Sequence, residues 1–347
     1  ACLLISDSGE ILFAKNEHEH LPMASTTKIM TSLLTLENLE ACGNKEVEIT
    51  DEMVRVEGTS MGLMPKDILN LDGLVKGMLL CSGNDAATAS AIAIGGNIET
   101  FIKMMNEKAE QIGMHNTTFV TPSGLDKDNH HSTAYDMALL GAYAMENKDF
   151  TSISSKKSDK VEFINPPKCV SYRNHNKLLR LYDGCIGVKT GFTKAAGRCL
   201  VSCAQRNNVK LIAVTLNDPN DWEDHKNMLD YGFSNTVNVS FNDRNLKINI
   251  PVQGGTLSEI SACGISSFSR SFKRGDENKV KRVIEAKDYC DAPVEKGQIV
   301  GRVAYYLNGK EIGKNEILSE DSVEKIEKEK NFFQKIINFI RKNLIFN

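Results

Sequence analysis

The chain has 347 residues, of which 41% are hydrophobic and 25% charged, and it carries a formal net charge of −3 with a sequence pI near 6.2. This length and apolar content predict one domain of roughly 230 residues and a smaller second domain. The slightly acidic balance excludes bulk affinity for nucleic acid, and no glycine pattern of a phosphate loop or a dinucleotide fold is present.

The chain opens with Ala1 inside an apolar run at residues 2–5, which predicts a strand. No signal peptide precedes this run. We therefore expect a trimmed chain whose export signal has been removed.

Residues 25–28, Ser-Thr-Thr-Lys, open a segment with apolar residues at helical spacing. The spacing predicts a helix whose first turn carries Ser25 and Lys28 on one face. A hydroxyl at a helix start can act as a nucleophile. A neighbouring amine can take its proton once burial or a second cation lowers the amine pKa. The alternative role of Ser25 is an N-cap.

Ser82-Gly83-Asn84 lies between two predicted helices, at residues 74–80 and from residue 85 to about 96. A loop at this point can present Ser82 as a proton relay to a leaving amine and Asn84 as a partner of a substrate amide. The alternative is an interhelical turn in which Asn84 or Asp85 caps the next helix.

Lys189-Thr190-Gly191 continues a short predicted strand and is followed by two more strands, at residues 198–204 and 209–216, joined by a turn at residues 207–208. Such an edge can bind an extended peptide. Lys189 supplies positive charge, Thr190 donates to a carboxylate, and Gly191 lets a substrate backbone approach closely. The alternative is a plain edge strand protected by an exposed lysine.

In this order and at these separations the three motifs resemble those of penicillin-binding proteins and class A β-lactamases. The chain most resembles the serine D-Ala-D-Ala carboxypeptidases among low-molecular-mass penicillin-binding proteins, of the sporulation-associated Gram-positive type. Further stretches that carry the resemblance are residues 7–12, 80–87, 113–125, 132–136, 187–197 and 218–233.

The resemblance implies an α+β fold. A penicillin-binding/β-lactamase-like transpeptidase domain, made of a helical cluster and an antiparallel sheet, would occupy residues 1–235. It implies an enzyme that removes the terminal D-alanine from peptidoglycan stem peptides and is inhibited by β-lactams. The site residues that it implies are Ser25 as nucleophile, Lys28 as base, Ser82 and Asn84 beside the substrate, Lys189, Thr190 and Gly191 along the bound peptide, and the backbone N–H groups of Ser25 and Phe192 as oxyanion hole.

One departure concerns the segment Asn174-His175-Asn176, where some family members carry an arginine. The resemblance makes His175 a substrate-binding candidate that is cationic or neutral near pH 7. Arg198, after Gly197, is a second cation candidate, and its alternative role is a solvated strand end.

The nine cysteines include no Cys-x-x-Cys pair, and their odd number leaves at least one thiol free. We expect them to be scattered small core residues, with Cys199 and Cys203 at opposite depths of one strand. Free thiols in an exported protein indicate a reducing habitat. The seven histidines show no zinc-ligand spacing, so no metal and no cofactor are expected.

After residue 235 the pattern changes to short alternating strands, at residues 237–241, 246–251, 280–286 and 299–307, with a turn at residues 308–309. This predicts a small all-β domain over residues 236–315. The tail, residues 316–347, is first charged and then has apolar residues at helical spacing with cations and no acids after Lys330. It is too short and polar to span a bilayer, so residues 331–347 are predicted to be an amphipathic helix on a membrane surface. A helix docked on protein is the alternative.

Three functions remain open at this level. The first is the carboxypeptidase, exported and anchored to the outer face of the cytoplasmic membrane, with cross-link endopeptidase action as a variant. The second is a class A-like β-lactamase, against which stand Gly83 in the second motif and the lack of a convincing deacylating glutamate. The third is a penicillin-binding sensor or wall-binding scaffold without turnover.

Overall fold

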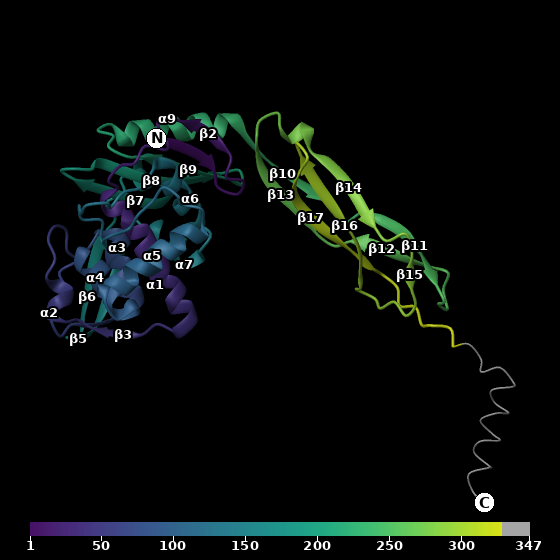
Figure 1. Cartoon of the computed structure of the whole chain (residues 1–347), viewed down its shortest axis with the longest axis horizontal. Helices are drawn as coiled ribbons and strands as arrows, with labels where there is room; N and C mark the ends of the chain where they lie inside the picture. The colour runs from purple at the N-terminus through teal and green to yellow at the C-terminus, as the bar shows by residue number, and fades with distance from the viewer. Residues whose placement is uncertain (328–347) are drawn as a thin grey trace, which may run out of the picture. The chain divides into compact units, whose positions relative to one another are not determined.

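The computed structural model describes residues 1–327, which fall into two compact units (Figure 1). The first unit holds residues 1–238 and 270–274, and the second holds residues 239–269 and the described chain from residue 275. The first combines helices with antiparallel sheets and the second is all β, so the predicted fold class is confirmed.

The helices of the first unit cover one sheet on both faces. They are η1 (Ala24–Thr27), α1 (Lys28–Cys42), α2 (Asp51–Val54), α3 (Leu71–Leu80), α4 (Asn84–Gly95), α5 (Ile98–Gln111), α6 (Ala134–Ala144), α7 (Lys148–Ser154), α8 (Leu178–Leu181) and α9 (Asp221–Asn235). The helix predicted to open with residues 25–28 corresponds to η1 and α1, and those predicted at residues 74–80 and 85–96 correspond to α3 and α4.

The central sheet is antiparallel and five-stranded, with β7 at one edge. Its strands in spatial order are β2 (Ile11–Ala14), β1 (Cys2–Ile5), β9 (Val209–Thr215), β8 (Gly197–Arg206) and β7 (Cys185–Thr193). Helix α9 lies along one face, and the remaining large helices lie on the other (Figure 1). The turn between β8 and β9 has positive φ at Asn207 (49°) and Asn208 (63°), the conformation that a tight hairpin requires.

Alternation along β8 separates two cores. Cys199, Val201 and Cys203 join the core under α1, whereas Leu200 and Ala204 join the core under α9. The expectation that Cys199 and Cys203 lie at opposite depths was wrong. Residues four apart in a strand point to the same face, and both thiols are fully buried together.

A second, four-stranded antiparallel sheet flanks the helices. It consists of β3 (Glu46–Glu48), β4 (Ile68–Asn70), β5 (Ser158–Asn165) and β6 (Lys168–Arg173). The sequence did not predict it, because β3 and β4 have only three residues each, and β5 and β6 carry many exposed polar side chains.

The second unit is built on a six-stranded sheet. Its order is β14 (Lys281–Ala286), β16 (Ile299–Leu307), β17 (Lys310–Ser319), β12 (Glu259–Gly264), β11 (Lys247–Gln253) and β15 (Cys290–Asp291). Strands β10 (Thr236–Asn242) and β13 (Ser267–Lys273) form a separate pair, and η2 (Glu277–Lys279) is a short turn. Strand β17 runs across residue 315, where the sequence places the end of this domain. The buried side of the large sheet centres on Val303, Tyr305 and Ile317.

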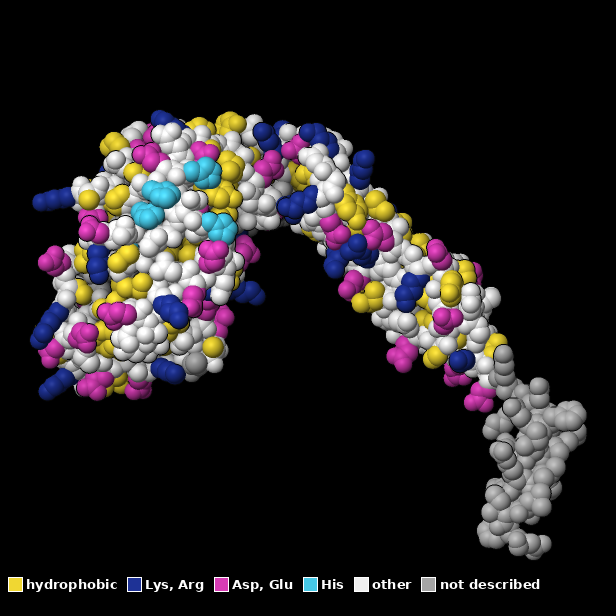
Figure 2. All heavy atoms as spheres, viewed as in Figure 1, with side chains coloured by type: hydrophobic (Ala, Val, Ile, Leu, Met, Phe, Trp, Pro, Cys, Tyr) yellow, Lys and Arg dark blue, Asp and Glu magenta, His cyan; other side chains and the backbone are white. Residues whose placement is uncertain are grey.

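Acidic and basic side chains are interspersed on the visible face of both units (Figure 2). The eight cysteines whose side chains are described are free thiols, and no group of described residues is arranged to hold a metal ion. Between residues 1 and 327, no helix has the length and apolarity to cross a bilayer. The predicted amphipathic segment 331–347 lies outside the described residues.

Candidate active site

Ser25 sits in the tight turn η1, immediately before α1. Its neighbours Ala24, Thr26 and Thr27 are buried, and Ser25 itself is partly exposed. Ala24 has a positive φ of 48°, a conformation that costs energy for a residue with a Cβ and that marks a constrained turn. Thr26 closes the turn by donating from Oγ1 to the Met23 carbonyl at 2.5 Å. The turn therefore presents one hydroxyl in a fixed position.

Lys28 is fully buried next to this hydroxyl. Its Nζ lies 2.9 Å from Ser25 Oγ, 2.6 Å from Asn84 Oδ1 and 2.6 Å from the Ser123 carbonyl. Burial and the Lys189 ammonium lower the pKa of the Lys28 amine well below its usual value of 10.5. A neutral amine has two N–H groups and one lone pair. Two carbonyl acceptors and one hydroxyl donor match this set.

Asn84, the first residue of α4, is held by the loop that follows α2. Its Nδ2 donates to the Glu57 carbonyl at 2.6 Å, and its backbone N–H donates to the Thr59 carbonyl at 2.7 Å. These bonds leave Oδ1 aimed at Lys28. The amide orientation of Asn84 is thus set by backbone groups of a loop more than twenty residues away.

Asp85 anchors the same loop. Its buried carboxylate accepts from the backbone N–H groups of Met61 at 2.9 Å, Gly62 at 3.1 Å and Leu63 at 3.0 Å, and from the Ser60 hydroxyl at 2.6 Å. An ionised carboxylate is the side chain that can accept this many bonds. Asp85 therefore holds in place the loop that positions Asn84.

The segment 121–125 closes the site from the side of α1. Thr31 donates to the Pro122 carbonyl at 2.6 Å, and Lys28 bonds the next carbonyl, that of Ser123. Gly124 has a φ of +85°, and a Cβ built on it would lie 1.9 Å from the Ala24 carbonyl oxygen. Only glycine fits this approach to the Ser25 turn.

His130 is hydrogen-bonded to Thr27, the last residue of the Ser25 turn. Its Nδ1 accepts from the Val120 N–H at 2.9 Å, so the neutral ring carries its proton on Nε2, which lies 2.9 Å from Thr27 Oγ1 and donates to it. Burial, with a smaller effect of His131, lowers the pKa of His130 to about 4. The ring is therefore a neutral bridge near pH 7.

Edge strand β7 brings the third motif to the Ser25 turn. A Cβ on Gly191 would meet the Ser25 backbone nitrogen at 3.0 Å, so strand and turn are in direct contact. Lys189 is buried, its Nζ donates to the Thr190 carbonyl at 2.8 Å, and burial lowers the pKa of its amine to about 7. Among the described residues, no strand pairs with the side of β7 that faces away from β8. The three motifs, far apart in sequence, thus meet at the Ser25 turn and Lys28.

Comparison with known proteins agrees with this geometry. The family model described as D-alanyl-D-alanine carboxypeptidase, peptidase S11, matches residues 1–220. This chain belongs to that family. A second family model, described as the penicillin-binding protein 5 C-terminal domain, matches residues 236–325.

Individual relatives extend over most of the chain. D-alanyl-D-alanine carboxypeptidase DacF of Bacillus subtilis is 32% identical over 94% of this chain and 85% of its own. DacC of Escherichia coli is 33% identical over 96% of this chain and 85% of its own. The crystal structure of penicillin-binding protein 5 from Haemophilus influenzae superposes with a TM-score of 0.71 at 30% identity, covering 93% of this chain and 96% of that one. The predicted family and enzyme class are confirmed.

Ser82 opens the second motif of this carboxypeptidase. It is buried in the turn between α3 and α4 with a φ of +64°. Within the described residues its hydroxyl makes no hydrogen bond to Ser25, Lys28 or Lys189. The structure therefore fixes the backbone of the second motif and leaves this hydroxyl without a partner among the three.

The two cation candidates differ. The backbone N–H of His175 donates to the Leu80 carbonyl at 3.1 Å, and partial burial together with the Lys189 ammonium lowers the pKa of its ring. Arg198 does not serve as a free cation. Its Nη2 lies 2.7 Å and 3.0 Å from the two carboxylate oxygens of buried Asp221, and its guanidinium stacks 5.5 Å from the Trp222 ring.

Phe192 follows Gly191 on β7, and its side chain is 66% exposed. Its expected part in the site is its backbone N–H, which adjoins the contact between β7 and the Ser25 turn.

Sequence reasoning gave no function to Asp85, Ser123, Gly124 or His130. In the sequence, Asp85 is a helix-cap candidate and part of the matching stretch 80–87, and Gly124 is part of the matching stretch 113–125. Asp85 lies in the run Ser-Gly-Asn-Asp, and Ser123 and Gly124 lie in the run Pro-Ser-Gly-Leu. The roles of these residues depend on contacts with residues distant in the sequence.

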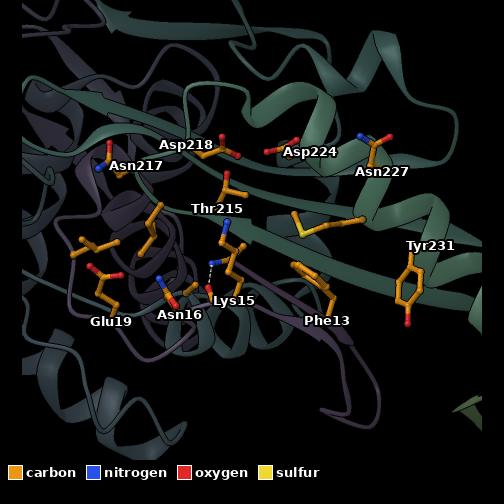
Figure 3. Close-up of a pocket in the computed structure, with 15 residues that line it drawn as sticks. Phe13, Lys15, Asn16, Glu19, Thr215, Asn217, Asp218, Asp224, Asn227 and Tyr231 are labelled. Carbon is orange, nitrogen blue, oxygen red and sulfur yellow. Dashed lines mark hydrogen bonds between the residues drawn. The ribbon is translucent and has the colours of Figure 1, made fainter.

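A cavity lies elsewhere in the first unit. It has a volume of about 800 Å³ and is lined from β2, β9 and α9, with Phe13, Thr215 and Tyr231 among its residues (Figure 3). None of the predicted site residues lines it. This cavity is therefore separate from the residues that meet around Ser25.

Proposed function

We propose that this enzyme removes the terminal D-alanine of peptidoglycan stem peptides through an ester on Ser25. The observation that carries the proposal is the 2.9 Å contact between Ser25 Oγ and the buried Lys28 Nζ, whose pKa is lowered. A neutral amine at this distance can accept the hydroxyl proton as the oxygen attacks.

The proposed reaction has two halves. Ser25 Oγ attacks the carbonyl carbon between the two D-alanines while its proton passes to Lys28. The backbone N–H groups of Ser25 and Phe192 stabilise the negative oxygen that forms. The C–N bond then breaks, and the departing amine of D-alanine receives a proton, relayed by Ser82. Water hydrolyses the resulting ester in the second half and frees Ser25.

Substrate orientation is proposed to come from β7. Its open edge suits an extended peptide, and the absence of a Cβ at Gly191 lets that peptide approach the Ser25 turn. Asn84 would bind a substrate amide, while Lys189 and Thr190 would bind the terminal carboxylate. His175 would border the same end, and its lowered pKa favours the neutral ring near pH 7. A neutral ring contributes hydrogen bonds rather than charge.

The deciding experiment measures D-alanine release from a peptide that ends in Lys-D-Ala-D-Ala. Wild type is compared with Ser25→Ala and with Ser152→Ala, a control at an exposed serine of α7. We expect release by wild type and Ser152→Ala only. Release by folded Ser25→Ala would refute the assignment of the nucleophile.

Labelling with a fluorescent penicillin separates the other functions. Stable labelling at Ser25 with no D-alanine release, also from a cross-linked peptide, would indicate a sensor or scaffold. Rapid loss of the label with penicillin turnover would indicate a β-lactamase. Cleavage of only the cross-linked peptide would indicate an endopeptidase.

We also propose that the protein acts outside the cytoplasmic membrane and is held there by residues 331–347. This rests on the composition of the segment, whose apolar residues recur at helical spacing beside Lys335, Arg341 and Lys342. Co-sedimentation with anionic vesicles tests it. Deleting residues 331–347 should abolish binding, and unchanged binding would reject the anchor.

The remaining finer proposals concern domain limits and cellular timing. Limits at residues 235 and 315 predict that limited proteolysis leaves a penicillin-labelled fragment ending near residue 235. A sporulation-associated role, proposed from the tract 218–233, predicts expression confined to spore formation. Constant expression during growth would contradict it.

A further inference from the structure

Strand β14 ends the six-stranded sheet of the second unit. It pairs with β16, and among the described residues no strand pairs with its other side (Figure 1). Open edges of this kind are available to another strand, and proteins usually shield them. The residues of β14 show what strand would fit.

The pairing with β16 identifies the backbone groups that face outward. The N–H of Lys287, just after β14, donates to the Val300 carbonyl at 3.1 Å, so residues 287 and 300 are a hydrogen-bonded pair. In an antiparallel ladder such pairs alternate, so residues 281, 283 and 285 also bond to β16. Arg282, Ile284 and Ala286 therefore direct their N–H and C=O groups to the open edge.

Apolar side chains are exposed on both faces of this edge. Val283 and Ile284 are each 42% exposed. Ile284 pairs with the buried Val303 and so lies on the core side of the sheet, at its open margin. Val283 lies on the opposite face, between Lys281 and Glu285. A charged residue thus flanks an apolar one on each side.

We propose that β14 pairs antiparallel with β14 of a second copy, about a two-fold axis at Val283. Hydrogen bonds across the two-fold axis can form only between residues whose N–H and C=O groups face the open edge, which are every second residue. The axis must therefore pass through a residue and not between two residues. An axis at Val283 places Lys281 opposite the partner's Glu285 twice, with Val283 facing its own copy between them. An axis at Ile284 would instead place Lys281 opposite the partner's Lys287. Charge complementarity selects the first register.

Two side chains of β16 fix the position of the Glu285 carboxylate. Glu285 is held by Arg302 Nε at 2.6 Å and by the Tyr306 hydroxyl at 2.8 Å, which fix its carboxylate beside the strand. The two Ile284 side chains lie diagonally across the axis and cover each other. Five residues a side, 281–285, pair in this register and make a small interface, and interfaces below about 1,200 Å² are typically weak and transient. A concentration-dependent dimer is therefore expected.

Sedimentation of the full chain over a concentration series tests the proposal, with Ile284→Pro as the decisive variant. Proline at 284 removes an outward N–H and leaves the β14–β16 bonds, as edge positions allow. Wild type should form dimers as concentration rises, and Ile284→Pro should stay monomeric with unchanged circular dichroism and penicillin labelling. A monomeric wild type at millimolar concentration, or equal dimerisation of Ile284→Pro, would overturn the proposal.

Two further variants test the register. Cys169 is an exposed free thiol, so it is first replaced by serine. In this Cys169→Ser background, Val283→Cys should form an intermolecular disulfide on mild oxidation, because directly opposed non-hydrogen-bonded positions lie within disulfide reach; the Cys169→Ser parent should not. Lys281→Glu should weaken the dimer about tenfold by opposing two carboxylates twice. Lys310→Glu, the same charge change at an exposed site on β17, should have no effect. A dimer that Val283→Cys does not cross-link would refute the register.

Discussion

Gly124→Ala is expected to disable the site without removing any catalytic group. Gly124 has a φ of +85°, and its added Cβ would lie 1.9 Å from the Ala24 carbonyl oxygen and 2.8 Å from Thr27 Oγ1. Both neighbours belong to the turn that presents Ser25. The added methyl group is therefore expected to displace the turn that positions Ser25.

The size of the effect follows from the geometry. To bring the shortest contact from 1.9 Å to 3.0 Å, the turn or the 121–125 segment must move by about 1.1 Å. A misplacement of about 1 Å at a catalytic group costs on the order of 100-fold in rate. Positive φ adds about 1 to 2 kcal/mol of strain for alanine. We expect penicillin acylation to fall by about two orders of magnitude, with a lower thermal midpoint.

Gly96→Ala is a control that separates the displacement of the Ser25 turn from the backbone strain of alanine at positive φ. Gly96 caps α4 with a φ of +76°, and a Cβ there would meet nothing within 4 Å. It should lose about the same stability from strain and keep wild-type acylation. The assay is the second-order rate of labelling by fluorescent penicillin, alongside thermal unfolding. Wild-type acylation by Gly124→Ala would refute the claim that this contact positions Ser25.

Three further substitutions test other parts of the site. Asp85→Asn should lower kcat/KM for D-alanine release about tenfold and lower the thermal midpoint, because an amide cannot accept every bond of the carboxylate; an unchanged kcat/KM would contradict this. Lys189→Met removes the charge that lowers the Lys28 pKa, so that pKa should rise. Because neutral Lys28 is the reactive form, the acid limb of the acylation rate should move to higher pH, and a shift to lower pH would contradict it. Arg198→Leu leaves Asp221 buried without its partner, which should cost about 2 kcal/mol in chemical unfolding, discounted because Arg198 is 39% exposed. Acylation should change little, and a large loss would make Arg198 part of the site.

The structural predictions that were confirmed depend on residues that are close together in the sequence. Ser25 and Lys28 lie one turn apart, so a helix start alone brings them together. The strands predicted at residues 198–204 and 209–216 are also local, because two asparagines form the turn between them. The helices on either side of Ser82 were likewise visible from periodicity and small residues. In each of these cases the partners are within a few residues of one another.

The parts that the sequence did not give depend on contacts between distant residues. Asp85 bonds residues 22 to 25 positions earlier, and His130 meets Thr27 across 103 positions. Neither residue type nor spacing distinguishes these side chains from an ordinary cap or a surface histidine. The four-stranded sheet was missed for a related reason. Two of its strands have three residues, too few to show an alternating pattern, and the other two carry many exposed polar side chains, so the strands are defined by their pairing with one another.

The supports that were missed share one target. Gly124 and His130 act on the turn that holds Ser25, while Asp85 acts through a loop and Asn84 on Lys28. The reacting pair is thus fixed from three directions by hydrogen bonds and close packing. Burial lowers the pKa of the Lys28 amine, the Lys189 ammonium lowers it further, and the Asp85 carboxylate opposes both. Gly124 and His130 therefore act on the position of the nucleophile alone. Asp85 acts on position, through the loop and Asn84, and also on the basicity of Lys28.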